Sequence, residues 1–123
     1  MSNHHDLAER YLAIWNEGDD ARRRAMMADT WAEDARYSDP LMQGEGRDGI
    51  AAMIAGARAQ FPGHCFSLDG LPDAHGANLR FSWTLAPESG GAAVARGTDF
   101  AVLDAAGRLA RVTGFLDQPP AGA

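Results

Sequence analysis

The most constraining feature of this sequence is a strict alternation of side chains from residue 78 to residue 85. The apolar members are Leu79, Phe81, Trp83 and Leu85, and the polar members are Asn78, Arg80, Ser82 and Thr84. A period of two predicts a β-strand with one buried face. The Gly-, Pro- and Asp-rich segments "PDAHG", "PESGG" and "DAAG" flank the later strands at hairpin spacing. The second half of the chain is therefore expected to form antiparallel hairpins.

The first half of the chain shows helical periodicity instead. A first helix is expected over residues 3–17, a short second one over 19–27 with Asp19 or Asp20 as its cap, and a third from near Asp48 to the Pro62–Gly63 stop. A short strand at 35–38 and a loop at 39–46 lie between the last two helices. Helices first and hairpins last predict an α+β domain, with three helices packed on one face of a strongly curved antiparallel or mixed sheet.

Length and composition limit the classes of function. The 123 residues suit a single domain, 1–123, with a short disordered tail near 118–123. A net charge of −6 argues against a nucleic-acid partner, and no apolar run approaches the ~18 residues of a membrane span. Cys65 is the only cysteine and no signal segment opens the sequence, so a reducing, cytoplasmic location is expected.

The last hairpin places an acid among small side chains. If residues 104–107 close the turn, Leu103 pairs with Arg108, and Asp99 lies opposite Val112. The face around Asp99 then holds small or apolar side chains: Ala95, Gly97, Ala101, Ala110, Val112 and Gly114. A carboxyl group between apolar walls should have a raised pKa. The alternative is a structural Asp99 paired with Arg96, Arg111 or a backbone amide, although alternation points both arginines to the opposite face.

That opposite face is itself apolar. It is expected to present Val94, Thr98, Phe100, Val102, Leu109, Thr113 and Phe115, with Arg96 and Arg111 among them. Left uncovered, this face would form a large exposed patch. A homodimer through the outer sheet face is therefore expected.

Four segments in order also give the chain a family resemblance: "RYLAIWNEGD", "WAEDARYSDP", "GRDGI" and "DFAVLDAAGRL". Together they resemble the nuclear transport factor 2-like superfamily, in its SnoaL-like and ketosteroid isomerase branch. The resemblance implies a cystatin-like α+β roll, in which the bent sheet and three helices enclose a cone-shaped, mostly apolar pocket.

The resemblance also implies roles for three residues. Tyr11 matches the oxyanion-hole tyrosine of ketosteroid isomerase, Asp39 its general base and Asp99 its oxyanion-hole aspartic acid, so that Asp39 would stay ionised at the rim and Asp99 neutral inside. Asp99 also matches the catalytic aspartate of SnoaL-like polyketide cyclases. Ile54 replaces a supporting tyrosine, and Trp31 stands where some relatives have tyrosine.

Eight further residues are expected to line the pocket: Trp15, Trp31, Met42, Ile54, Phe81, Trp83, Val112 and Leu116. No cofactor or metal is expected. "GEGRDG" at 44–49 matches a dinucleotide fingerprint but lacks a βαβ context, and His64, Cys65 and His75 lack the spacing of zinc ligands.

These expectations favour a cofactor-independent isomerase or aldol-type cyclase that transfers protons on a small apolar carbonyl compound, steroid- or polyketide-like. The alternative is a non-catalytic carrier or sensor of a hydrophobic ligand with the same pocket. A third possibility is an interaction module whose dimer face is its functional surface.

Overall fold

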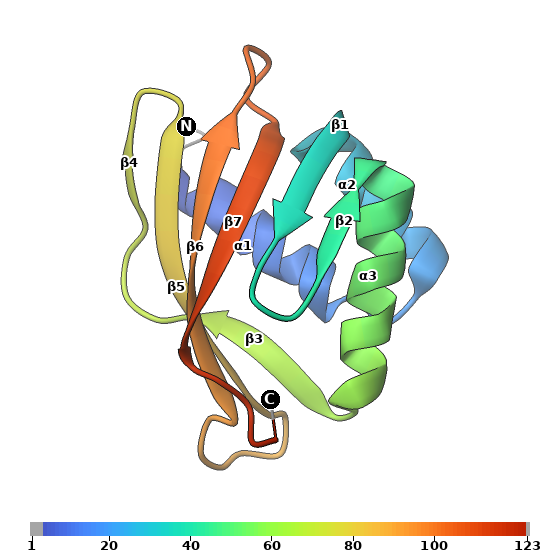
Figure 1. Ribbon diagram of the computed structural model, residues 1–123, viewed down its shortest axis with the longest axis vertical. Helices are drawn as coiled ribbons and strands as arrows, with labels where there is room; N and C mark the ends of the chain where they lie inside the picture. The colour runs from blue at the N-terminus through green and yellow to red at the C-terminus, as the bar shows by residue number, and fades with distance from the viewer. Residues whose placement is uncertain (1–3, 123) are drawn as a thin grey trace.

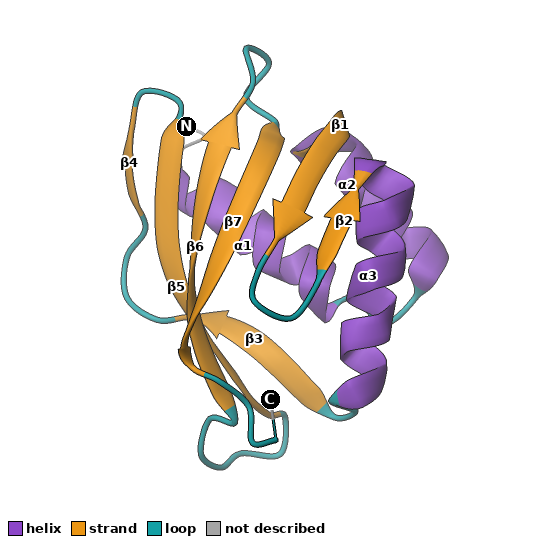
Figure 2. Ribbon diagram, in the orientation of Figure 1, coloured by secondary structure: helices purple, strands orange, loops and turns teal. Residues whose placement is uncertain are grey.

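The computed structural model describes residues 4–122 and contains three helices and a curved, unclosed mixed sheet (Figures 1 and 2). The helices are α1 (His4–Asn16), α2 (Asp20–Thr30) and α3 (Gly46–Gln60). The strands are β1 (Trp31–Ser38), β2 (Gln43–Glu45), β3 (His64–Leu68), β4 (Asp73–His75), β5 (Asn78–Pro87), β6 (Ala95–Leu103) and β7 (Leu109–Gln118). The predicted α+β class is confirmed. Asn3, where the first helix was expected to begin, lies outside the described residues.

The helices form where apolar spacing and capping coincide. In α1 the predicted stripe of Leu7, Tyr11, Ile14 and Trp15 is buried. Asp19 caps α2 as expected, because its carboxylate accepts a hydrogen bond from the Arg22 amide at 2.8 Å. Figure 1 shows α1 crossing behind the long strands, while α3 runs beside β1 and β2.

The sheet has the strand order β2-β1-β7-β6-β5-β3, with β4 paired to β5. All pairings are antiparallel except that of β1 with β7, which is parallel. This parallel contact joins the segment after α2 to the last strand, and it places the end of β1 beside the middle of β7. Residues 44–49 span the end of β2 and the start of α3, and β2 is antiparallel to β1, so no βαβ unit surrounds the glycine motif.

The register of the last hairpin differs from the expectation by two residues. Asp99 pairs with Gly114 rather than Val112, and Ala101 pairs with Val112. One residue of the difference arises at the turn, where Leu103 pairs with Leu109 rather than Arg108, and the other comes from an irregularity between Val102 and Leu103 that leaves an extra residue on β7. Since the shift is even, Asp99 still faces inward.

The same irregularity changes the face of Leu109. This side chain was expected on the outer face, but it is fully buried in the core. Phe100 and Phe115 do lie on the outer face, where 40% and 57% of their surface is exposed. Strand β1 also begins at Trp31, four residues earlier than expected, and β2 occupies part of the expected loop.

Candidate active site

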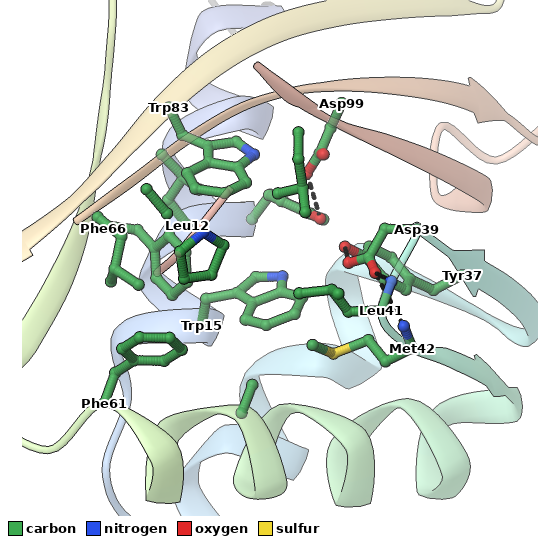
Figure 3. Close-up of a pocket in the computed structure, with 16 residues that line it drawn as sticks. Leu12, Trp15, Tyr37, Asp39, Leu41, Met42, Phe61, Phe66, Trp83 and Asp99 are labelled. Carbon is green, nitrogen blue, oxygen red and sulfur yellow. Dashed lines mark hydrogen bonds between the residues drawn. The ribbon is translucent and has the colours of Figure 1, made fainter. Parts of the chain in front are cut away.

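A small, mostly apolar cavity of about 60 Å³ lies between α1, α3 and the inner face of the sheet (Figure 3). Its wall is made of Tyr11, Leu12, Trp15, Tyr37, Asp39, Leu41, Met42, Ala57, Phe61, Phe66, Trp83, Leu85, Ala95, Asp99, Leu116 and Pro120. Asp39 and Asp99 are the only acidic residues among these lining residues, and none of the lining residues is basic. Two carboxyl groups therefore face a mostly apolar cavity.

The inner carboxyl belongs to Asp99 on β6, which is only 2% exposed. The hydroxyl of Tyr11, on α1, donates a hydrogen bond to Asp99 Oδ2 at 2.6 Å. The other oxygen, Oδ1, has no hydrogen-bond partner among the described residues. Neither Arg96 nor Arg111 contributes a bond to it, so the purely structural alternative considered for this aspartate finds no support in the contacts.

Burial raises the pKa of Asp99 to about 6, because desolvation disfavours its charged form. The Tyr11 hydroxyl and the Trp83 indole act in the opposite direction, while the negative charge of Asp39 raises the pKa further. The rise was expected, but it is modest. A pKa near 6 makes both protonation states of Asp99 accessible near neutral pH.

The outer carboxyl belongs to Asp39, which follows the end of β1 and is partly buried. Its Oδ1 accepts hydrogen bonds from the backbone amides of Leu41 at 2.7 Å and Met42 at 2.9 Å. Its Oδ2 accepts one from the Tyr37 hydroxyl at 2.5 Å. The aspartate therefore forms the turn ahead of β2 and faces the cavity with the same carboxylate.

The two carboxyl groups meet across Gly114 on β7. A Cβ atom at this position would lie 2.8 Å from Asp99 Oδ1, 3.1 Å from Asp39 Cβ and 3.2 Å from the Tyr37 hydroxyl. Only a residue without a side chain leaves room for these three groups together. Burial raises the pKa of both Tyr11 and Tyr37, so these hydroxyls stay protonated and act as donors.

Aromatic rings in mutual contact form the rest of the wall. Trp15 packs on Tyr37 and Phe66, with ring centroids 5.6 and 5.3 Å apart, and Phe66 packs on Trp83 at 5.2 Å. Trp83 lies against the backbone of β6 at Gly97, where a Cβ would come within 2.7 Å of the indole ring. The wall is consequently rigid and shaped by ring-to-ring packing.

The structure places most of the predicted site residues on this wall. Those on it are Tyr11, Trp15, Asp39, Met42, Trp83, Asp99 and Leu116. Four predicted wall residues lie instead in the packed core: Trp31, Ile54, Phe81 and Val112. Their strand or helix faces point inward as expected, but they do not line this cavity.

Tyr37 is the main residue that sequence reasoning missed. It precedes Asp39 by two positions, so the period of a strand would have placed both on the same face. Pro120 was also missed, since the segment after β7 was expected to be disordered and it contributes to the cavity wall. Leu12, Phe61 and Phe66 complete the apolar surroundings.

Within residues 4–122, no group of three His, Cys, Asp or Glu side chains is arranged to hold a metal ion. None of the helices in this range combines the length and apolar character needed to cross a membrane.

The family model for the SnoaL-like domain matches residues 8–112, a segment that includes both aspartates and Tyr11. The chain belongs to the SnoaL-like domain family. The SnoaL-like resemblance found in the sequence is thus confirmed.

Solved structures agree with this membership. A protein from Agrobacterium tumefaciens str. C58, named as a candidate isomerase of the SnoaL-like family, shares 54% identity over 93% of this chain and 97% of that chain, with a TM-score of 0.88. Comparison with curated proteins found no match.

Two more distant structures show the fold alone. A candidate SnoaL-like polyketide cyclase from Jannaschia sp. CCS1 is 17% identical over 95% of this chain and 90% of its own, with a TM-score of 0.69. A protein with a cystatin-like fold from Methylobium petroleophilum PM1 is 21% identical over 98% and 79%, with a TM-score of 0.72. The expected cystatin-like roll is thus confirmed.

Proposed function

We propose that this SnoaL-like domain is a cofactor-independent enzyme that transfers protons on a small apolar carbonyl compound, in the manner of an isomerase or an aldol-type cyclase. The observation that carries the proposal is Asp99, a buried carboxyl group whose pKa is raised to about 6 on the wall of an apolar cavity. A general acid–base group is most effective when its pKa lies near the working pH.

The geometry supports Asp99 as the acid–base group and Tyr11 as its hydrogen-bonded partner. The base removes a proton from the carbon beside the carbonyl, and one proton, which can first exchange with solvent on the base, returns to a carbon or to oxygen, so that no net proton is gained or lost. The Tyr11 hydroxyl, 2.6 Å from Asp99 Oδ2, can donate to the oxygen on which charge develops once the carboxyl is protonated. This assignment follows the role that the resemblance to SnoaL-like polyketide cyclases implied for Asp99, and departs from the ketosteroid isomerase comparison, in which Asp39 is the base.

The size of the cavity bears on the substrate. A volume of about 60 Å³ is well below the ~300–1,000 Å³ of pockets for drug-sized ligands. A compound close to one ring in size is therefore favoured over a whole steroid. The names given to the Agrobacterium and Jannaschia proteins are consistent with isomerase or cyclase chemistry.

An assay that does not require the natural substrate to be known tests the proposal. A panel of small ketones, cyclic enones and β-diketones is incubated with the protein in D₂O, and incorporation of deuterium beside the carbonyl is followed by proton NMR. We expect exchange with the wild type and its loss in Asp99→Asn. Asp34→Asn is the matched control, because Asp34 lies on the exposed side of β1.

Binding without exchange would favour the other candidate, a carrier or sensor of a hydrophobic ligand. In that case Asp39→Asn and Asp99→Asn should leave ligand affinity close to that of the wild type. Exchange that persists in Asp99→Asn would contradict the assigned role of Asp99.

A further inference from the structure

The Tyr37 hydroxyl has one partner in the structure, the Oδ2 atom of Asp39. The other oxygen of that carboxylate is occupied by two backbone amides, those of Leu41 and Met42. A carboxylate offers about four acceptor positions, and three of them are filled here. The Asp39 side chain is therefore held in one orientation from both sides, by the turn that follows it and by the tyrosine two residues before it.

Strand register explains why this fixed carboxylate faces Asp99. On one side of β7, Asp99 is paired directly with Gly114. On the other side, Ser38 pairs with Thr113, so the parallel strand β1 delivers Asp39 next to Gly114. Gly114 has no side chain to separate them. A Cβ atom at this position would lie 2.8 Å from Asp99 Oδ1 and 3.2 Å from the Tyr37 hydroxyl, so both groups border the same small space.

The two tyrosine–aspartate pairs are thus unequal. In the Tyr37–Asp39 pair, both carboxylate oxygens have donors. In the Tyr11–Asp99 pair, Oδ2 has one donor and Oδ1 has no partner among the described residues. A buried oxygen without a donor is the one on which a proton is most readily accepted, because protonation removes an unsolvated charge.

We propose that Tyr37 is a positioning residue, which holds Asp39 as a fixed negative neighbour of Asp99 across Gly114 and thereby makes Asp99 the carboxyl that exchanges a proton with the ligand. The proposal deepens the proposed function and rests on it for the ligand. The arrangement itself can be measured in the protein without a ligand. It also disfavours carboxylate ligands, since they would meet two like charges.

Burial has the largest effect and raises the pKa of Asp99, and neighbouring groups then modify it. Tyr11 from α1 and Trp83 from β5 interact with its carboxyl and lower its pKa, Asp39 from the end of β1 raises it, and the Tyr37 hydroxyl lies beside it as a neutral donor. Removing Tyr11 and removing Tyr37 should consequently have opposite effects. This opposition separates positioning from a general loss of structure.

The experiment is a carboxyl NMR titration of protein labelled with ¹³C-aspartate, from pH 4 to pH 8. In Asp39→Asn the titration midpoint of Asp99 should fall by a fraction of a pH unit, because the negative neighbour is removed while the amide side chain keeps the turn. Tyr37→Phe should move the midpoint in the same direction, since the freed carboxylate can turn towards water. Tyr11→Phe should raise the midpoint. Backbone amide shifts far from the site report whether each variant is folded.

Suppose that the Asp99 midpoint falls in Asp39→Asn but is the same in Tyr37→Phe as in the wild type. This result would show that Tyr37 does not position the Asp39 carboxylate. An unchanged midpoint in Asp39→Asn would show that the two carboxyl groups do not interact, and either result overturns the proposal.

The deuterium-exchange assay then separates this inference from the proposed function. If exchange occurs, the pH at which its rate is half-maximal should move down with the Asp99 midpoint in Tyr37→Phe. If no compound exchanges while the titration behaves as expected, the positioning of Asp39 by Tyr37 stands and the proposed enzymatic function fails.

Discussion

Replacing Asp99 with asparagine should change the way in which stability depends on pH. Asparagine has nearly the same shape and can accept the Tyr11 hydrogen bond, but it does not titrate. In the wild type, the pKa of Asp99 is about 6 in the folded protein against a model value of 3.8. The folded state therefore binds this proton more tightly than the unfolded state.

The sign and the size of the effect follow from linkage. A raised pKa in the folded state means that the stabilisation from Asp99 is full below about pH 4 and is lost as the pH rises through about 6. The whole change amounts to about 3 kcal/mol, because each pKa unit corresponds to about 1.4 kcal/mol. Since Asp99 is buried, solvent screening does not reduce this figure greatly. Relative to the wild type, Asp99→Asn should gain about 2 kcal/mol of this between pH 4 and pH 7.

Urea unfolding followed by tryptophan fluorescence, at several pH values between 4 and 7.5, measures this difference. Subtracting the wild-type curve from that of the variant cancels the other titrating groups. A difference that stays constant across this range would show that the carboxyl titrates alike in the folded and unfolded states, and the argument from burial would fail. A variant that becomes relatively less stable as pH rises would reverse the sign of the coupling.

Three further predictions concern the core and the outer face. Tyr11→Phe should lower the free energy of unfolding by about 1–3 kcal/mol, and by more at pH 7 than at pH 4, because an ionised carboxylate loses its donor; urea unfolding at both pH values checks this. Gly97→Ala should destabilise by about 1–3 kcal/mol, since the new methyl group would lie 2.7 Å from the Phe115 carbonyl oxygen. Gly56→Ala, in an open part of α3, should instead stabilise the folded protein by up to about 1 kcal/mol. Thermal melts measure both variants, and a raised melting temperature in Gly97→Ala or a lowered one in Gly56→Ala would contradict these expectations. We also propose that the outer face around Phe100 and Phe115 forms a homodimer, so that light scattering at micromolar concentration should give twice the monomer mass and Phe115→Glu should halve it; a monomeric wild type would rule out this interface.

Local pattern determined much of the fold and part of the site. Helical spacing in the first 60 residues and strict alternation from residue 78 were enough to place the three helices and the main strand, because each period leaves only one buried face. The same alternation turned Asp99 inward even though the predicted register was wrong by two residues, since an even shift keeps the face. Tyr11 and Asp39 were found through the family pattern, and the structure places both on the cavity wall.

Other features depended on contacts between distant segments. The parallel pairing of β1 with β7 and the approach of Pro120 to the cavity join residues far apart in the chain. Trp31 and Phe81 show a related limit of sequence patterns. A period predicts that a side chain is buried, but it does not predict whether that side chain lines the cavity.

The sequence by itself determined which faces are buried and which chemical groups are present. Tertiary structure alone decided that Tyr11 donates to Asp99 and that Gly114 lets the two aspartates approach each other. The physical reason is that a side chain's direction follows from its own backbone, whereas the environment of a carboxyl group depends on neighbours that distant segments bring beside it.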